Sequence, residues 1–146
     1  MRNIWIRWVK HIQNYIRAQF KDILVTRAFL DNNPDVCFVF GDNTVRSGYG
    51  GAAILRDHPR AYGFITKIFP DNRDSSFYTV DDYEDVFFEE VEKLKEFVSS
   101  HPNEKIYISQ IGGGLANKYK IWENIIKPNM EKEFSEFENV VFLWKK

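Results

Sequence analysis

Two glycine-rich stretches are the parts of this sequence best suited to hold a ligand. The first covers residues 41–53 (GDNTVRSGYGGAA), leaves an apolar strand-like run and enters a short helix. Glycine lets the backbone approach a ligand closely and adopt positive φ, so free N–H groups and a helix N-terminus can surround a phosphate. The candidate ligand-binding residues here are Gly41, Asn43, Arg46, Gly48, Gly50, Gly51 and Ala52.

The second stretch follows another apolar run, residues 105–110. Its candidate ligand-binding residues are Ile111, Gly112, Gly113, Gly114 and Leu115. In open α/β sheets ligands bind beyond the carboxyl ends of the strands, so two such loops can face one crevice. The pair predicts a site for a phosphate-bearing nucleotide, although either loop taken alone could be only a tight turn.

Other well-known site patterns fit the sequence less well. Gly48, Gly50 and Ala53 mimic the dinucleotide fingerprint, but the tract starts several residues past the strand, and the lysine of a phosphate-binding P-loop is absent. The three histidines are scattered without the spacing of metal ligands. Neither a metal site nor a Ser-His-Asp arrangement is therefore expected.

The elements that must position these loops alternate between strands and helices. Thr79 is suited to cap a helix over residues 81–100, and a second helix is predicted over residues 122–134, with Pro128 as a kink or break. This alternation predicts a layered α/β fold with a parallel or mixed sheet. Strands are predicted at residues 23–27, 36–41, 62–69, 105–110 and 140–144.

The chain divides into a short N-terminal extension and one domain. Residues 1–22 predict an amphipathic helix, because their apolar side chains recur at three- and four-residue steps; the first 20 residues hold four basic and no acidic side chains. Such a helix packs on its own domain, grips a partner or lies on an anionic membrane. Residues 23–146 are predicted to form the α/β domain.

Composition limits the classes of partner. The 146 residues are 44% hydrophobic with a formal net charge of −1, so the chain has the core of a folded domain and lacks the cationic field of a nonspecific nucleic-acid binder. Cys37 is the only cysteine, and no run of 18 apolar residues or secretion signal is visible. A cytoplasmic protein without a membrane span is expected, with no nucleic acid as its default partner.

Four short motifs follow one another along the chain: GYGGA (48–52), ITK (65–67), IGGGL (111–115) and WEN (122–124). Their order and spacing resemble those of macrodomains, especially the terminal ADP-ribose protein glycohydrolase branch. Residues 25–27, residues 40–43 and the Thr66-Lys67 pair are also similar to small macro-like proteins of bacteria and their phages. The resemblance covers residues 23–144.

The resemblance implies a three-layer α/β/α sandwich with a mixed central sheet, a small-molecule ligand of ADP-ribose type and no cofactor. Residues 48–52 would lie near the distal ribose, and residues 111–115 would wrap the diphosphate. Asn43 would bond ribose hydroxyls. An ADP-ribosylated macromolecule is the partner implied for the hydrolytic branch, and the compartment for a phage protein would be the host cytoplasm.

Lys67 and Asp42 are the candidate catalytic residues. Lys67 matches the lysine that forms a covalent adduct with ribose in the glycohydrolase branch, but Ala116 stands where that branch has an aspartate. A lysine is protonated at neutral pH unless burial or a nearby cation lowers its pKa, so Lys67 alone is a weak nucleophile. Asp42 could supply the carboxylate; alternatively, Lys67 pairs with a phosphate or with Asp42. Arg46 could clamp a phosphate or stay solvated.

The predicted function is binding of ADP-ribose or a related nucleotide, with or without hydrolysis of an ADP-ribosyl bond. The missing aspartate is the reason for the first alternative, a non-catalytic module that reads or sequesters the nucleotide. The remaining alternative is an interaction protein that uses the N-terminal helix.

Overall fold

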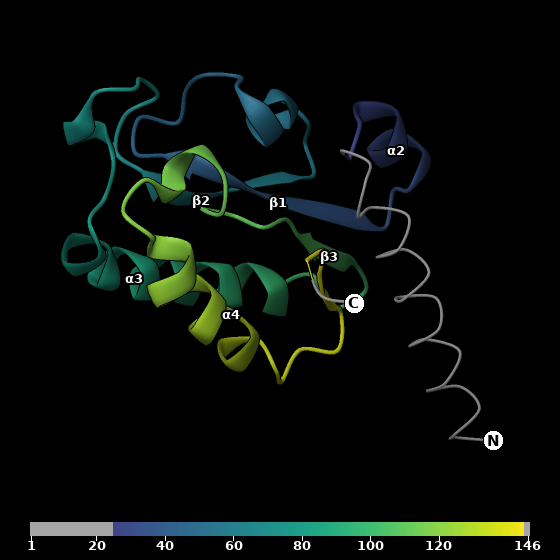
Figure 1. The fold of residues 1–146 in the computed structure, drawn as a ribbon. Helices are drawn as coiled ribbons and strands as arrows, with labels where there is room; N and C mark the ends of the chain where they lie inside the picture. Colours follow the sequence, from purple (N-terminus) through teal and green to yellow (C-terminus); the bar gives the residue numbers. More distant parts are fainter. Residues whose placement is uncertain (1–24, 145–146) are drawn as a thin grey trace.

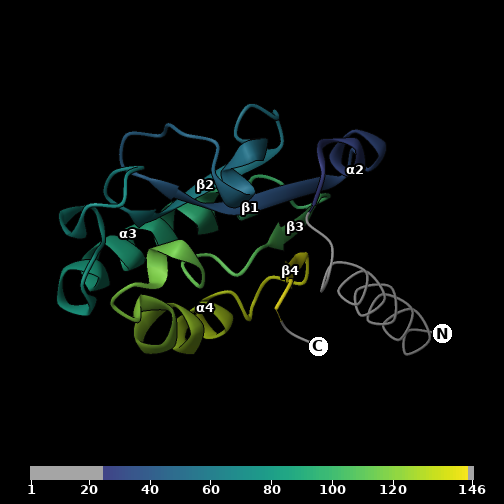
Figure 2. The same cartoon turned by 45° about the horizontal axis from the view of Figure 1, so that its top comes forward.

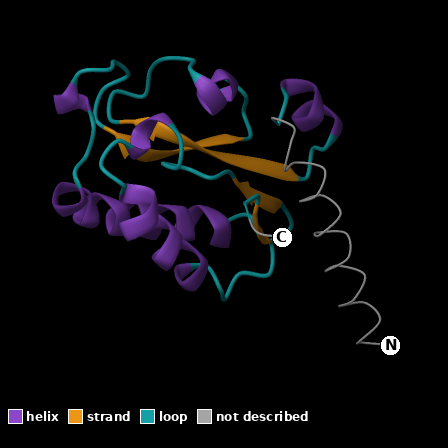
Figure 3. Ribbon diagram, in the orientation of Figure 1, coloured by secondary structure: helices purple, strands orange, loops and turns teal. Residues whose placement is uncertain are grey.

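A computed structural model describes residues 25–144 of the chain (Figure 1). The helix predicted for residues 1–22 lies outside the described residues. Figure 3 shows how helices and strands alternate along the chain. In chain order the elements are α2 (Arg27–Asn32), β1 (Val36–Asn43), the 3-10 helix η1 (Gly51–Leu55), β2 (Ala61–Lys67), η2 (Asp74–Ser76), α3 (Val80–Ser99), β3 (Lys105–Ile108), η3 (Leu115–Asn117), the π-helix η4 (Trp122–Ile126), α4 (Lys127–Glu133) and β4 (Val140–Phe142).

The four strands form one parallel sheet in the order β2-β1-β3-β4. The α/β class is confirmed, whereas the mixed sheet expected from the resemblance is wrong for the described strands. The reason is that each strand is joined to the next by a crossover that carries a helix, and such connections leave consecutive strands parallel. Within residues 25–144, antiparallel pairing outside the sheet is limited to a bridge between Lys67 and Phe77.

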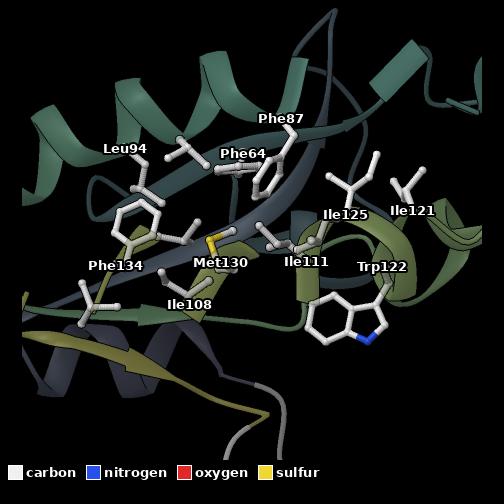
Figure 4. Close-up of a cluster of buried hydrophobic side chains, with 14 of the residues drawn as sticks. Phe64, Phe87, Leu94, Ile108, Ile111, Ile121, Trp122, Ile125, Met130 and Phe134 are labelled. Carbon is white, nitrogen blue, oxygen red and sulfur yellow. The ribbon is translucent and has the colours of Figure 1, made fainter. Parts of the chain in front are cut away.

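The two faces of the sheet are covered by different helices. On one face Cys37, Val39 and Ile108 pack with apolar side chains of α3, η4 and α4, as Figure 4 shows for the central part of this cluster. On the other face Phe38 and Phe40 pack with side chains from α2 and η1. This division follows from the two-residue period of a strand, which sends successive side chains to opposite faces. The arrangement is visible in Figure 2, where α3 and α4 lie below the sheet and η1 lies above it.

Helix α3 is close to its prediction. The side chain of Thr79 accepts a hydrogen bond from the N–H of Asp82 at 3.3 Å and donates one to the Asp82 carboxylate at 2.9 Å. This reciprocal cap fixes the start of the helix. The apolar stripe then faces the sheet and is buried: Tyr83, Phe87, Val91, Leu94 and Val98.

Two predicted elements differ in the structure. Residues 23–27 were expected as a strand, but Thr26 caps α2 by accepting from the N–H of Phe29 at 3.1 Å, and Arg27 begins that helix. A threonine side chain that satisfies a free helix N–H favours the helix over an extended run. Pro128 does not end its helix; the chain changes from π-helix to α-helix at Lys127, and the proline sits in the first turn of α4, where its missing N–H costs little.

None of the helices described between residues 25 and 144 is both long enough and apolar enough to cross a lipid bilayer.

Candidate functional site at the carboxyl edge of the sheet

The two glycine-rich loops meet at the carboxyl edge of the sheet. Both leave parallel strands, β1 and β3, that are direct neighbours. A Cβ placed on Gly41 would lie 3.1 Å from Oγ1 of Thr66 and 3.6 Å from the backbone N of Gly112. Both loops therefore begin at the same edge of the sheet.

The loops then diverge to opposite faces of the sheet. After β1 the chain passes to the face covered by η1, whose Ala53 and Leu55 pack with Phe38 and Phe40. After β3 it passes to the face covered by η4 and α4. Two neighbouring strands whose connections leave in opposite directions define a topological switch point, which is where open α/β sheets bind ligands.

The first loop, residues 44–51, is shaped by Asn43. Its side-chain Nδ2 donates to the carbonyl of Ser47 at 2.8 Å, and its Oδ1 accepts from the N–H of Val45 at 3.2 Å. Gly48 and Gly51 have φ of 95° and 58°. Asn43 is buried and bonded within the loop, so in this conformation it organises the loop, whereas the resemblance assigns it to ribose hydroxyls.

Asp42 is a buried carboxylate held by two arginines. Its side chain is 2% exposed, and Arg56 binds both oxygens, with Nη1 2.9 Å from Oδ2 and Nη2 2.7 Å from Oδ1. Arg46 Nη1 lies 3.1 Å from Oδ2, and the N–H of Asn43 donates to Oδ1 at 2.8 Å. Burial alone would raise the pKa of Asp42, but the hydrogen bonds from Arg56, Asn43 and Arg46 outweigh it and hold the pKa below its usual value.

The side chain of Arg46 binds groups of the protein itself, one of them on strand β2. Its guanidinium donates to the carbonyl of Gly63 on β2 at 2.7 Å and lies 3.7 Å from Oε1 of buried Glu90. The same Glu90 oxygen accepts a hydrogen bond from the N–H of Ile65, also on β2, at 2.7 Å. A Cβ on Gly63 would lie 2.3 Å from Oδ2 of Asp42, so this glycine makes room for the ion cluster. The side chain of Arg46 is therefore engaged, while its backbone, at φ 54°, forms part of the loop.

Sequence reasoning missed Arg56 and Glu90. Arg56 lies 14 residues after Asp42, and Glu90 is one of many acidic residues of α3. A signal for Glu90 was available, because it falls next to Val91 on the apolar side of the helix and is buried with it. For Arg56 no local pattern exists; the crossover from β1 to β2 decides the contact.

Lys67 lies at the same edge but is separate from the Asp42 cluster. Its Nζ donates to the backbone carbonyl of Asp71 at 2.5 Å and stands over the ring of Phe77, 4.6 Å from the centroid. Within residues 25–144 no ion pair joins Lys67 to Asp42, whose oxygens are taken by Arg56 and Arg46. The two candidate catalytic residues are thus on neighbouring strand ends and bound to different partners.

The second loop has one anchored end and one open end. Ile111 is buried in the core shown in Figure 4, and Gly112 adopts φ 73° with its Cα against Ile126. Beyond it nothing lies within 4 Å of the position that a Cβ on Gly114 would take, and Leu115 is 81% exposed. Gly50 and Gly51 of the first loop likewise have open space where a Cβ would be. Both loops therefore present bare backbone outward.

The sequence matches one protein family model over residues 20–118, and that model is described as a family of unknown function (DUF7831). The chain belongs to this family. The matched span contains α2, all of β1 to β3 and both glycine loops of this DUF7831 protein, and it ends at Lys118. No curated protein and no solved structure matches the chain.

Two aromatic residues of the DUF7831 chain, Trp122 and Tyr49, differ in their exposure. Trp122 is a core residue, packed edge-on against Trp144 with 5.1 Å between the ring centroids (Figure 4 shows its place in the cluster). Tyr49 is exposed in the first loop, and its hydroxyl donates to Asp57 at 3.0 Å. Between residues 25 and 144, no three His, Cys, Asp or Glu side chains gather as they would around a metal ion.

Proposed function

We propose that this protein binds a phosphate-bearing nucleotide of ADP-ribose type between its two glycine loops, at the carboxyl edge of β1 and β3. The observation that carries the proposal is the switch point, where loops 44–51 and 109–115 leave neighbouring parallel strands toward opposite faces. The resemblance of the motifs to macrodomains makes ADP-ribose the first ligand to test. The three-layer macrodomain fold is part of the same proposal.

The conformation of Gly50 supports a role for this glycine in ligand binding rather than in forming a turn. Its φ of −74° and ψ of 141° are open to every residue, and no atom lies within 4 Å of its missing Cβ. Neither the backbone conformation nor a neighbouring atom of the protein therefore requires glycine at this position. A ligand that approaches the backbone closely would require it, because a side chain would stand in its way.

We propose binding without hydrolysis. Asp42 is saturated by Arg56 and Arg46, and a carboxylate held ionised by two guanidiniums is a poor proton acceptor. Lys67 lies beside the Asp71 carbonyl and the Phe77 ring and, within residues 25–144, forms no ion pair with Asp42, and Ala116 supplies no carboxylate at the second loop. Within the described residues these contacts favour a module that holds or sequesters the nucleotide.

A thermal-shift panel tests the proposal. A ligand that binds only the folded state raises the melting temperature, by an amount equivalent to about 2.7 kcal/mol at a hundred times its Kd. We expect a rise with at least one of ADP-ribose, NAD, cyclic ADP-ribose and ADP-ribose phosphates. The Gly50→Glu variant should lose the shift, because its carboxylate would occupy the open space and repel the phosphate.

Gly50→Gln is the matched control, since it adds a side chain of the same size without charge. We expect it to keep part of the shift, and both variants should keep the melting temperature of the free protein because the backbone conformation suits any residue. If no nucleotide of the panel shifts the wild type, or if Gly50→Glu responds as strongly as the wild type, the proposed site is wrong.

A further inference from the structure

We propose a second anion-binding site at the carboxyl edge, in which Lys67 and Lys118 hold a phosphate or diphosphate group beside the ring of Phe77. The site extends the proposed function, and only its role within a nucleotide rests on that function. Three separate segments build it: the end of β2, the segment before α3 and the turn after η3.

Lys67 is the first element of this site. Its half-buried ammonium has a backbone carbonyl and an aromatic face as neighbours, and within residues 25–144 no carboxylate lies within 4 Å of it. An ammonium has three donors, and only one is taken here by the carbonyl of Asp71. A cation removed in part from water and left without a counter-charge favours an anionic ligand.

Lys118 is the second element. Its Nζ stands 5.3 Å from the centroid of the same Phe77 ring. Its carboxylate partner, Asp74, has a side chain that is 78% exposed, so the ion pair is open to water and weak. An incoming phosphate with several oxygens can replace Asp74 at little cost and accept from both lysines.

The nearby acidic groups do not block this site. The carboxylate of Asp71 is bound by Arg73 at 2.7 Å and by the hydroxyl of Ser76 at 2.5 Å. Those contacts hold the pKa of Asp71 well below its usual value, so the carboxylate stays ionised and keeps its hold on Arg73. Asp71 thus meets Lys67 through its neutral carbonyl, which leaves the ammonium charge available.

The position of the two lysines connects them to the glycine loops. Lys67 is paired in register with Asn43, the residue that shapes the first loop. Lys118 follows Leu115 by three residues, just past the second loop. A ligand with two separated anionic groups would therefore find both receptors on one edge of the sheet.

Isothermal titration with inorganic pyrophosphate tests the site without any nucleotide. We expect Lys67→Gln and Lys118→Gln each to weaken pyrophosphate binding about tenfold or more, since each substitution removes a charge-assisted hydrogen bond to the ligand. Lys67→Arg should bind within a few fold of the wild type because it keeps the charge. Lys105→Gln is the control, because Lys105 starts β3 at the opposite edge and pairs with Asp35 at 3.3 Å.

Either of two results overturns the inference: wild type that does not bind pyrophosphate, or binding that Lys67→Gln and Lys118→Gln weaken no more than Lys105→Gln does. Urea denaturation checks that the variants are folded, and should Lys67→Gln fail to fold, Lys118→Gln at its more exposed site decides alone. Lysine-dependent pyrophosphate binding without any nucleotide shift would leave this site standing and remove only the nucleotide proposal.

Discussion

Replacing Asp42 with asparagine is expected to lower the free energy of unfolding by about 3–5 kcal/mol, the usual cost of breaking a buried ion pair from one side. The Asp42 side chain is 2% exposed and that of Arg56 is 13% exposed, so the variant leaves a guanidinium without its carboxylate in a place where water reaches it poorly. Urea denaturation followed by tryptophan fluorescence measures the loss. Because a domain is stable by only about 5–15 kcal/mol, the variant should be clearly weakened.

The matched control is Asp35→Asn. Asp35 pairs with Lys105 at 3.3 Å, and both side chains are about half exposed, so the expected loss is below about 1 kcal/mol. If Asp42→Asn is as mild as Asp35→Asn, the Asp42 cluster does not stabilise the fold, and a direct role of Asp42 toward a ligand would become the better explanation of its burial.

The Asp42 effect should also depend on pH, in a direction set by its lowered pKa. A carboxyl whose folded pKa is depressed contributes stability above its unfolded pKa of about 3.9, and the contribution is lost as pH falls through the folded value. The difference between wild type and Asp42→Asn should be constant from about pH 5 upward and shrink below about pH 4. A difference that stays unchanged into strong acid would contradict the ionised assignment.

The second large effect is expected from Gly112→Ala. Gly112 has φ 73°, where a side chain costs about 1–3 kcal/mol, and its Cβ would lie 2.4 Å from Cδ1 of Ile126, which adds about 1–3 kcal/mol of overpacking. The expected total loss in the free energy of unfolding is about 2–6 kcal/mol. Nucleotide binding should weaken as well, because Gly112 lies where the two loops meet.

A double-mutant cycle separates the two causes. Ile126→Val removes the Cδ1 methyl, so Gly112→Ala with Ile126→Val should lose less stability than the sum of the single variants, while the cost of the positive φ remains. Gly50→Ala in the first loop is the control, since its φ of −74° and ψ of 141° suit any residue and no atom stands near its missing Cβ. Strict additivity in the cycle would show that the contact with Ile126 is not what requires glycine at this position.

The residues at the carboxyl edge of the sheet have two roles. Asp42, Arg56, Arg46 and Glu90 form a framework, buried at its two carboxylates, that ties β1, β2 and α3 together. Gly50, Gly51, Gly114 and the two lysines lie outside that framework and present backbone and positive charge. Variants in the framework should therefore lower stability first, and variants of the outward residues should lower binding first.

The sequence by itself determined the elements whose causes are local. Thr79 with Asp82 and the apolar stripe of α3 define that helix within a few neighbouring residues, and the apolar runs of β1, β2 and β3 define strands in the same way. The two glycine stretches could also be placed at strand ends, because a loop must follow where an apolar run stops. That ligands of open α/β sheets bind beyond the carboxyl ends of the strands was the reason to expect that both loops could face one crevice.

Tertiary structure decided strand direction and the partners of every charged residue at the edge. Whether the sheet is parallel depends on how each crossover returns, and the partner of Asp42 depends on a crossover that brings Arg56 back over it. Lys67 could have met Asp42, but the turn at residues 71–77 gives it a carbonyl and an aromatic ring instead. Ion pairs leave no periodic pattern along the chain. Which of the many oppositely charged residues pair with one another is therefore determined only by the packing of the folded chain.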